Sequence, residues 1–179
     1  MFRRQLKLKK KLPKQLLSLT NKHQLEGRTK VVFDSKPFAF CLGIIKPQIY
    51  ISSNLLQIMN KEELEAIIVH EKYHLTHNDN ITRLFFSFLE TLFFFFPLIR
   101  DIKQSVLIKK EIRADDLAMK HLKTSYGILS ALKKLLQQPD FQYSFISSFS
   151  QTNTLEKRIE KLKGQILKRK RFSPTNIMI

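Results

Sequence analysis

The sequence predicts an α+β fold that is mainly helical, with a small sheet of short strands ahead of the first long helix. Glycine and proline are scarce, with 4 and 6 copies in 179 residues, which disfavours a turn-rich, all-β fold. Short runs of β-type residues lie between residues 31 and 51, whereas apolar residues recur at helical spacing beyond residue 60. The length is that of about one domain.

The β-type runs cover residues 31–33, 38–42 and 48–51, and proline or glycine separates them. They predict a sheet of two or three short strands. The first long helix follows Asn60, whose side chain can cap it, and Glu63 three residues later completes a capping-box pattern.

Later helices are expected in the Phe-rich stretch that ends at Pro97 and over residues 102–122 and 126–138. Residues 139–154 have no clear period and are expected to form a loop. An apolar helical period returns over residues 155–167.

The chain divides into three expected parts. Residues 1–29 form a basic arm or a membrane-surface segment, residues 30–138 form the core, and residues 139–179 form a loop followed by a basic helix and tail. Leucines alternate with lysines in the first twenty residues, and Pro13 interrupts any helix there. A membrane-surface helix and a solvated arm both fit this pattern.

The formal net charge of +17 indicates an anionic partner, either nucleic acid or the inner leaflet of a membrane. Lysine and arginine gather at the two ends of the chain. The single cysteine, Cys41, excludes an internal disulfide framework, and the N-terminus lacks the apolar region of a secretory signal peptide.

Residues 81–99 have about the length of a membrane span, but Arg83 and Glu90 lie within them. Either charge is costly in the middle of a bilayer. We therefore expect a helix that is buried on most sides or lies partly in the membrane interface, and a full span is the less favoured alternative.

The segment that carries chemistry is His70-Glu71-Lys72-Tyr73-His74. Histidines four apart lie on one face of a helix, about a turn apart, where two imidazoles can bind one Zn²⁺. Zinc lowers the pKa of water toward neutrality, and Glu71 can take the proton of that water as it attacks a peptide carbonyl. The remaining histidines, His23, His77 and His121, are expected at the surface.

A catalytic zinc site has three protein ligands and one open position. Among the downstream candidates, Glu111 and Asp115 form an i,i+4 pair on one helical face. One carboxylate can bind the metal while the other holds a ligand histidine by its second N–H. Spacing alone does not separate this arrangement from a solvated charged face.

The order of several segments resembles the metallopeptidase domain of the M56 family, which contains the BlaR/MecR antibiotic-sensing transducers. The matching segments are residues 36–40, 43–51, 62–74, 96–99 and 111–115. The chain is more distantly similar to the M48 family of HtpX-like proteases. The resemblance covers about residues 30–125, and residues 155–159 resemble a segment near the end of such domains.

The resemblance implies a zincin-type (gluzincin) fold, one Zn²⁺ per chain and a role for each matching residue. His70, His74 and Glu111 match the metal ligands, Glu71 matches the catalytic base, and Asp115 matches the acidic residue that supports the site. The strand that pairs with the substrate backbone matches five residues, Phe38, Ala39, Phe40, Cys41 and Leu42.

The resemblance also implies a setting: an endopeptidase that cuts protein or peptide substrates at the cytoplasmic face of a membrane. The basic ends agree with that side. Family members usually carry transmembrane helices around this domain, so we expect a stand-alone protease or part of a split system, with lipid and a membrane protein as further partners. The alternatives are a membrane-associated regulatory module with little proteolysis and a basic nucleic-acid-binding protein, although no nucleic-acid-binding signature is found.

Overall fold

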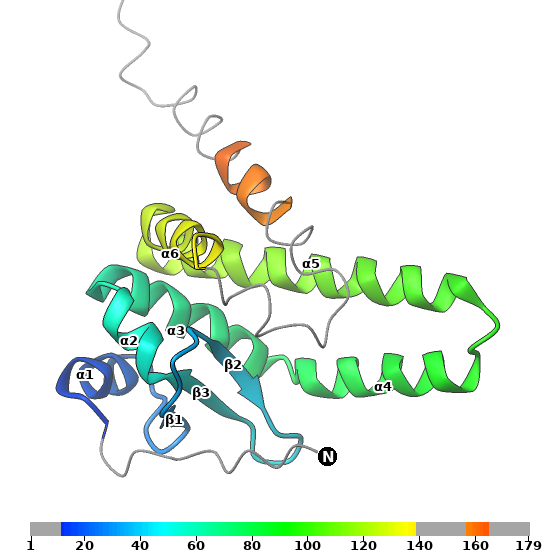
Figure 1. Ribbon diagram of the computed structural model, residues 1–179, viewed down its shortest axis with the longest axis horizontal. Coiled ribbons are helices and arrows are strands. Elements are labelled where there is room, and N and C mark those ends of the chain that lie inside the picture. Colours follow the sequence, from blue (N-terminus) through cyan, green and yellow to red (C-terminus); the bar gives the residue numbers. More distant parts are fainter. Residues whose placement is uncertain (1–11, 139–156, 165–179) are drawn as a thin grey trace, which may run out of the picture.

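The computed structural model describes residues 12–138 and 157–164 (Figure 1). Helices and strands follow in the order α1 (Lys14–Lys22), β1 (Thr29–Val32), β2 (Ala39–Leu42), β3 (Gln48–Ser52), α2 (Ser53–Ile58), α3 (Lys61–Thr76), α4 (Asp79–Leu92), α5 (Pro97–Leu122) and α6 (Tyr126–Leu136). Residues 157–164 are also helical. The expected α+β architecture, mainly helical with a small sheet, is confirmed.

The sheet has three strands in the order β1-β3-β2, with β3 in the centre. β1 runs parallel to β3, whereas β2 runs antiparallel to it. β2 therefore lies at one edge of the sheet, and the described residues add no further strand beside it.

Helix α3 is the centre of the fold, since it packs against α1, α5, α6 and the sheet. The core between α3 and the sheet contains Leu16 of α1, Ile49 and Ile51 of β3, and Ile68 of α3, all essentially inaccessible to solvent. Burial of such side chains is the main favourable term in folding. α1 contributes to this core, while the three-part division of the chain stays a prediction.

The capping box at the start of α3 is confirmed. The Asn60 side chain accepts a hydrogen bond from the Glu63 backbone N–H (2.9 Å), and the Glu63 carboxylate accepts one from the Asn60 N–H (2.8 Å). Glu63 is buried and also receives a hydrogen bond from Ser130 and an ion pair from Lys134, both on α6. This fixes the start of the helix that carries the histidines.

α4 and α5 form an antiparallel hairpin that projects from the rest of the molecule (Figure 1). Two sequence predictions are wrong at its far end: α4 ends at Leu92 rather than continuing toward Pro97, and α5 begins at Pro97 rather than at residue 102. Pro97 lies in the first turn of α5, where a backbone N–H has no acceptor within the helix, so the N–H that proline lacks costs no hydrogen bond.

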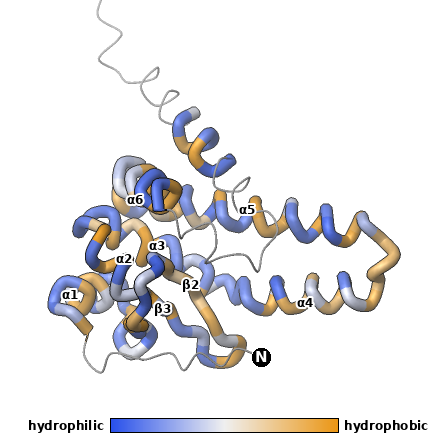
Figure 2. The backbone as a smooth tube through the Cα atoms, viewed as in Figure 1, coloured by the Kyte–Doolittle hydropathy of each residue, from blue (hydrophilic) through white to orange (hydrophobic). Residues whose placement is uncertain are grey.

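The apolar side chains of this hairpin face outward, so the first of the two expected alternatives, a helix buried on most sides, is also wrong, whereas a position in the membrane interface stays a prediction. Five exposed residues recur along one side of α4: Ile81, Leu84, Phe85, Phe88 and Leu92. The turn that follows adds four exposed phenylalanines, Phe93–Phe96. Figure 2 shows the hydrophobic end of the hairpin. Among the described residues, no helix is both long and apolar enough to cross a membrane.

Candidate metal centre

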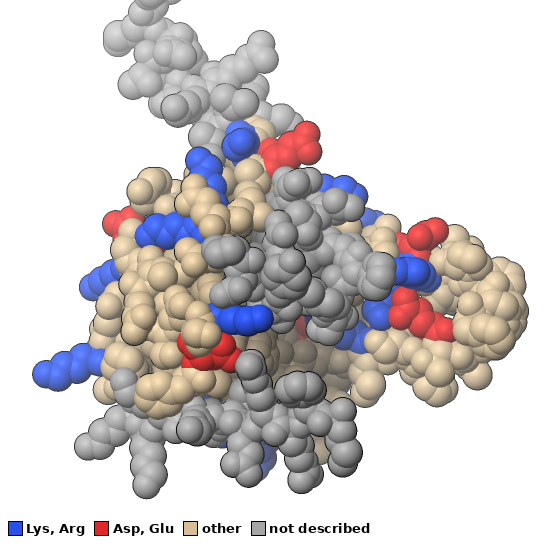
Figure 3. Space-filling view, in the orientation of Figure 1, with Lys and Arg blue, Asp and Glu red and all other residues tan. Residues whose placement is uncertain are grey.

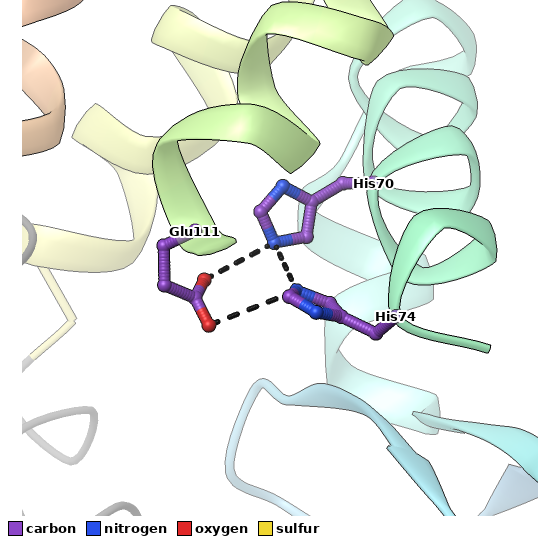
Figure 4. Close-up of side chains that lie close together, drawn as sticks. All are labelled: His70, His74 and Glu111. Carbon is purple, nitrogen blue, oxygen red and sulfur yellow. Dashed lines mark hydrogen bonds and ion pairs between the residues drawn. The ribbon is translucent and has the colours of Figure 1, made fainter. Parts of the chain in front are cut away.

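Two imidazoles and one carboxylate converge between α3 and α5 (Figure 4). His70 and His74 lie one turn apart on α3, are buried, and bring their Nε2 atoms to 3.1 Å from each other. Glu111 of α5 faces them, with Oε2 at 3.3 Å from His70 Nε2 and Oε1 at 3.7 Å from His74 Nε2. The possible ligand atoms of the three residues all lie within 4.8 Å of one another.

The other ring nitrogen of each histidine contacts a buried carboxylate. His70 Nδ1 lies 2.9 Å from Asp115 Oδ1, and His74 Nδ1 lies 2.6 Å from Asp79 Oδ2. A carboxylate at Nδ1 holds a proton there and leaves Nε2 free as a ligand atom, which is the usual support of a metal-binding histidine. Both imidazoles therefore present Nε2 to the space in front of Glu111.

These supporting carboxylates are held by cations from other parts of the chain. Asp115 receives two hydrogen bonds of 2.7 Å from Arg158 on the helical residues 157–164. Asp79 forms an ion pair with Lys110 of α5. Four segments therefore meet at the site: α3, the start of α4, α5 and the segment that carries Arg158.

The electrostatics of the cluster follow from these contacts. Burial lowers the pKa of His74, but the hydrogen bonds to Asp79 and Glu111 outweigh it and raise the pKa to about 10. Burial raises the pKa of Asp115, but the charge of Arg158 outweighs it and lowers the pKa to about 2. Burial also raises the pKa of Glu111, whereas hydrogen bonds from the two histidines lower it well below its usual range.

Glu71 follows His70 on α3 and is 7% exposed. The pKa of the Cys41 thiol on β2 is raised to about 11, first by burial and then by the negative charge of Glu71. The thiol is therefore protonated at neutral pH, which agrees with its expected role as a strand side chain rather than a nucleophile. Glu71 is therefore close enough to the edge strand for its charge to act on Cys41.

The pairing of β2 with β3 shows which backbone groups of β2 point away from the sheet. The Ser52 N–H donates to the Phe38 carbonyl (2.9 Å), and the register pairs Ala39 with Ile51 and Cys41 with Ile49. In an antiparallel ladder, N–H and C=O groups of alternate residues point to opposite sides. Those of Ala39 and Cys41 therefore point to the open edge of β2, away from β3.

The end of β2 is tied to the metal centre by the start of α4. The Asn80 side-chain amide donates to the Gly43 carbonyl (2.9 Å) and lies 3.9 Å from the Cys41 sulfur. Asn80 follows Asp79, which contacts His74. One short segment therefore sets both the orientation of a histidine and the position of the edge strand.

Several residues at the site carried no role in the sequence analysis: Asp79, Lys110, Arg83 and Arg158. Asp79 is five residues after His74, and the two side chains meet only because the chain turns between α3 and α4. Arg83 donates to Glu111 Oε1 (3.0 Å) from α4. Arg158 lies in the tail segment already noted as similar to the M56 domain, which was the one available signal.

The surface assignment of the other histidines is right for His77 and His121 and wrong for His23. His23 is 2% exposed, and its Nε2 lies 2.9 Å from Glu65 Oε1 on α3. Lys22 of α1 forms an ion pair with the same Glu65 oxygen at 2.7 Å.

A helix that presents two histidines and an adjacent glutamate, with a carboxylate from a second helix, defines a metallopeptidase-type domain. The chain belongs to the BlaR1 peptidase M56 family, whose model matches residues 1–162.

Curated relatives agree with this assignment. The regulatory protein BlaR1 of Bacillus licheniformis is 27% identical over 125 residues, which are 65% of this chain and 21% of that protein. A protease HtpX homolog of Herminiimonas arsenicoxydans is 42% identical over 53 residues, 28% of this chain and 18% of that protein. Another, from Archaeoglobus fulgidus, is 37% identical over 67 residues, 36% and 20% of the respective chains. The chain spans about a fifth of the length of these relatives.

Proposed function

We propose that the protein is a zinc-dependent endopeptidase of zincin (gluzincin) type that cleaves protein substrates at the cytoplasmic face of a membrane. The observation that carries this proposal is the convergence of His70 Nε2, His74 Nε2 and the Glu111 carboxylate, with both Nδ1 atoms held by carboxylates. Two imidazoles and one carboxylate are a known donor set for catalytic zinc, and they leave a fourth position open.

In this mechanism His70, His74 and Glu111 hold one Zn²⁺ per chain, and Asp115 and Asp79 orient the two imidazoles. When bound, zinc supplies a Lewis acid that polarises a peptide carbonyl and makes water acidic near neutral pH. Glu71, beside His70 and nearly buried, takes the proton of the attacking water and then delivers it to the leaving amine.

The substrate binds as an added strand along the open edge of β2. The N–H and C=O groups of Ala39 and Cys41 that point away from β3 pair with its main chain, so affinity depends first on backbone hydrogen bonds rather than on side chains. Phe38, Phe40 and Leu42 point their main-chain groups to β3 instead and stabilise the strand within the sheet.

The membrane contact is made by the end of the α4–α5 hairpin. Its apolar surface includes Phe94, Phe95 and Phe96, which are 84%, 63% and 54% exposed, and Leu98, which is 58% exposed. On the face that Figure 3 shows, this end is tan, and the acidic and basic side chains of the hairpin are set back from it. An end with this many exposed apolar side chains suits insertion among lipids.

The net charge of +17 complements the anionic headgroups of the cytoplasmic leaflet and supports that side. A membrane-protein partner beside the hairpin is part of the same proposal. Specific recognition of nucleic acid is not.

The test is zinc content and proteolysis of the full chain. We expect one zinc per chain, lost in His74→Ala, and cleavage of an unfolded protein substrate that is lost in Glu71→Gln while zinc stays bound. A chain that binds zinc but cleaves nothing would favour a regulatory module. Salt-sensitive retention on DNA by a chain without zinc would contradict the proposal.

A further inference from the structure

Arg158 lies on the helical residues 157–164, which form ion pairs with Asp115 and Asp116 of α5, and it is 8% exposed. Apolar contacts hold this segment independently of the arginine. Leu162, one turn further on, is 2% exposed and packs with Met119 of α5 and with Ile128 and Leu132 of α6. The segment that places the guanidinium at the metal centre therefore has apolar contacts of its own.

The guanidinium contacts three members of the metal centre. Nε and Nη2 donate to the two oxygens of Asp115, each at 2.7 Å. Nη1 lies 3.3 Å from Glu111 Oε2, and Nη2 lies 3.5 Å from His70 Nδ1. One side chain thus touches the third ligand candidate and the carboxylate that orients the first histidine.

From this geometry we infer that Arg158 is a positioning residue of the metal centre, which fixes Asp115 and Glu111 so that His70 Nε2 and the Glu111 carboxylate stay aimed at the ion. The inference rests on the proposed zinc site. It assigns to the segment 157–164 a part in metal binding, although none of its residues is a ligand.

The arrangement needs the planar fork of arginine. Parallel hydrogen bonds to both oxygens of Asp115 fix the rotation of that carboxylate, and the carboxylate in turn fixes the His70 ring through the 2.9 Å contact at Nδ1. On Glu111, Arg158 lies against Oε2 while Arg83 donates to Oε1, so both oxygens of the ligand are held. A lysine is a point charge and cannot form the bidentate pair.

A charge effect and a positioning effect predict opposite results. A cation beside a metal site opposes binding of another cation by Coulomb repulsion. If its charge were the only effect of Arg158 on the site, removing it would strengthen zinc binding. Removing an orienting partner of a ligand weakens binding, typically by about 10- to 100-fold. The direction of the change therefore separates the two.

The experiment measures zinc affinity of the full chain by competition with a chromogenic chelator, for the unsubstituted protein, Arg158→Gln and Arg158→Lys. Positioning predicts about 10- to 100-fold weaker binding for both variants, because neither keeps the bidentate pair. The absorption spectrum of the Co²⁺ form should change in both, since the ligand geometry is altered. If Arg158→Gln does not fold, as judged by circular dichroism, Arg158→Lys decides.

Lys161→Ala is the matched control. Lys161 lies on the same segment and forms an ion pair with Asp116 of α5 at 3.2 Å, but both side chains are partly exposed and outside the metal centre. This variant should keep the zinc affinity and the Co²⁺ spectrum.

Unchanged or stronger zinc binding in the Arg158 variants would overturn the inference and leave the proposed function intact. An equal loss in Lys161→Ala would also overturn it, because docking of the segment would then explain the effect. Absence of zinc from the unsubstituted chain would overturn the proposed function and this inference with it.

Discussion

Phe94 and Phe95 at the end of the α4–α5 hairpin offer a direct test of membrane contact. They lie in the turn between the two helices, and their rings meet edge to face with centroids 5.5 Å apart. Because neither contributes to the buried core, the double substitution Phe94→Ser, Phe95→Ser is expected to leave the fold unchanged.

The size of the effect follows from exposure. The two side chains are 84% and 63% exposed, which together amounts to about one and a half fully exposed phenylalanines. Burial of one phenylalanine in an apolar medium contributes about 1.5–3 kcal/mol, so the double variant loses about 2–4 kcal/mol of membrane affinity. That corresponds to a partition coefficient about 30- to 700-fold lower.

The assay is sedimentation with vesicles of phosphatidylcholine and phosphatidylglycerol at low and high salt. Attraction between charges falls at high salt, whereas the apolar contribution does not, so the difference between the proteins should persist there. Ile45→Ser is the matched control, since Ile45 is 91% exposed but lies on the β2–β3 connection. Equal binding by the double variant, or an equal loss in Ile45→Ser, would refute the reasoning.

Three further predictions concern the metal centre and the fold. Asp79→Asn leaves the Nδ1 proton of His74 with a weaker partner, so zinc affinity measured by chelator competition should fall about 10- to 100-fold. Gly127→Ala places a methyl group 2.9 Å from a backbone oxygen of α3, and urea unfolding should show about 1–2 kcal/mol of destabilisation. Gly164→Ala, whose added methyl group meets no atom of the described residues within 4 Å, should show none. Burial raises the pKa of Glu63, but hydrogen bonds outweigh it and lower the pKa. The ionised carboxylate therefore stabilises the fold above its unfolded-state pKa, and this contribution is lost as pH falls through the lower folded-state pKa. Glu63→Gln should therefore flatten this acid-side dependence in urea unfolding followed against pH, and an unchanged dependence would contradict the reasoning.

Local patterns were sufficient for the elements nearest the site. The capping box of Asn60 and Glu63 depends on residues three apart, so the sequence predicts it and the structure confirms it. The three β-type runs predicted the small sheet in the same way. The order of the strands, with β2 at the edge, depends on pairing between distant segments and could not be read from composition.

The hairpin shows where local pattern misleads. A run of phenylalanines favours the prediction of a buried helix, because phenylalanine side chains are often buried in folded proteins. Here the turn at Phe93–Phe96 interrupts the helices, and the phenylalanines face outward. Exposure is a property of the packed molecule, and no local rule reports it.

The sequence by itself determined that two imidazoles and a glutamate share one helix, because the α-helix repeats every 3.6 residues and brings His70 and His74 to the same face. Only the tertiary structure decided how they are aimed. Asp79 reaches the site from α4, Glu111 and Asp115 from α5, and Arg158 from residues 157–164. The contacts that orient the imidazoles therefore form only when α4, α5 and residues 157–164 are in place around α3.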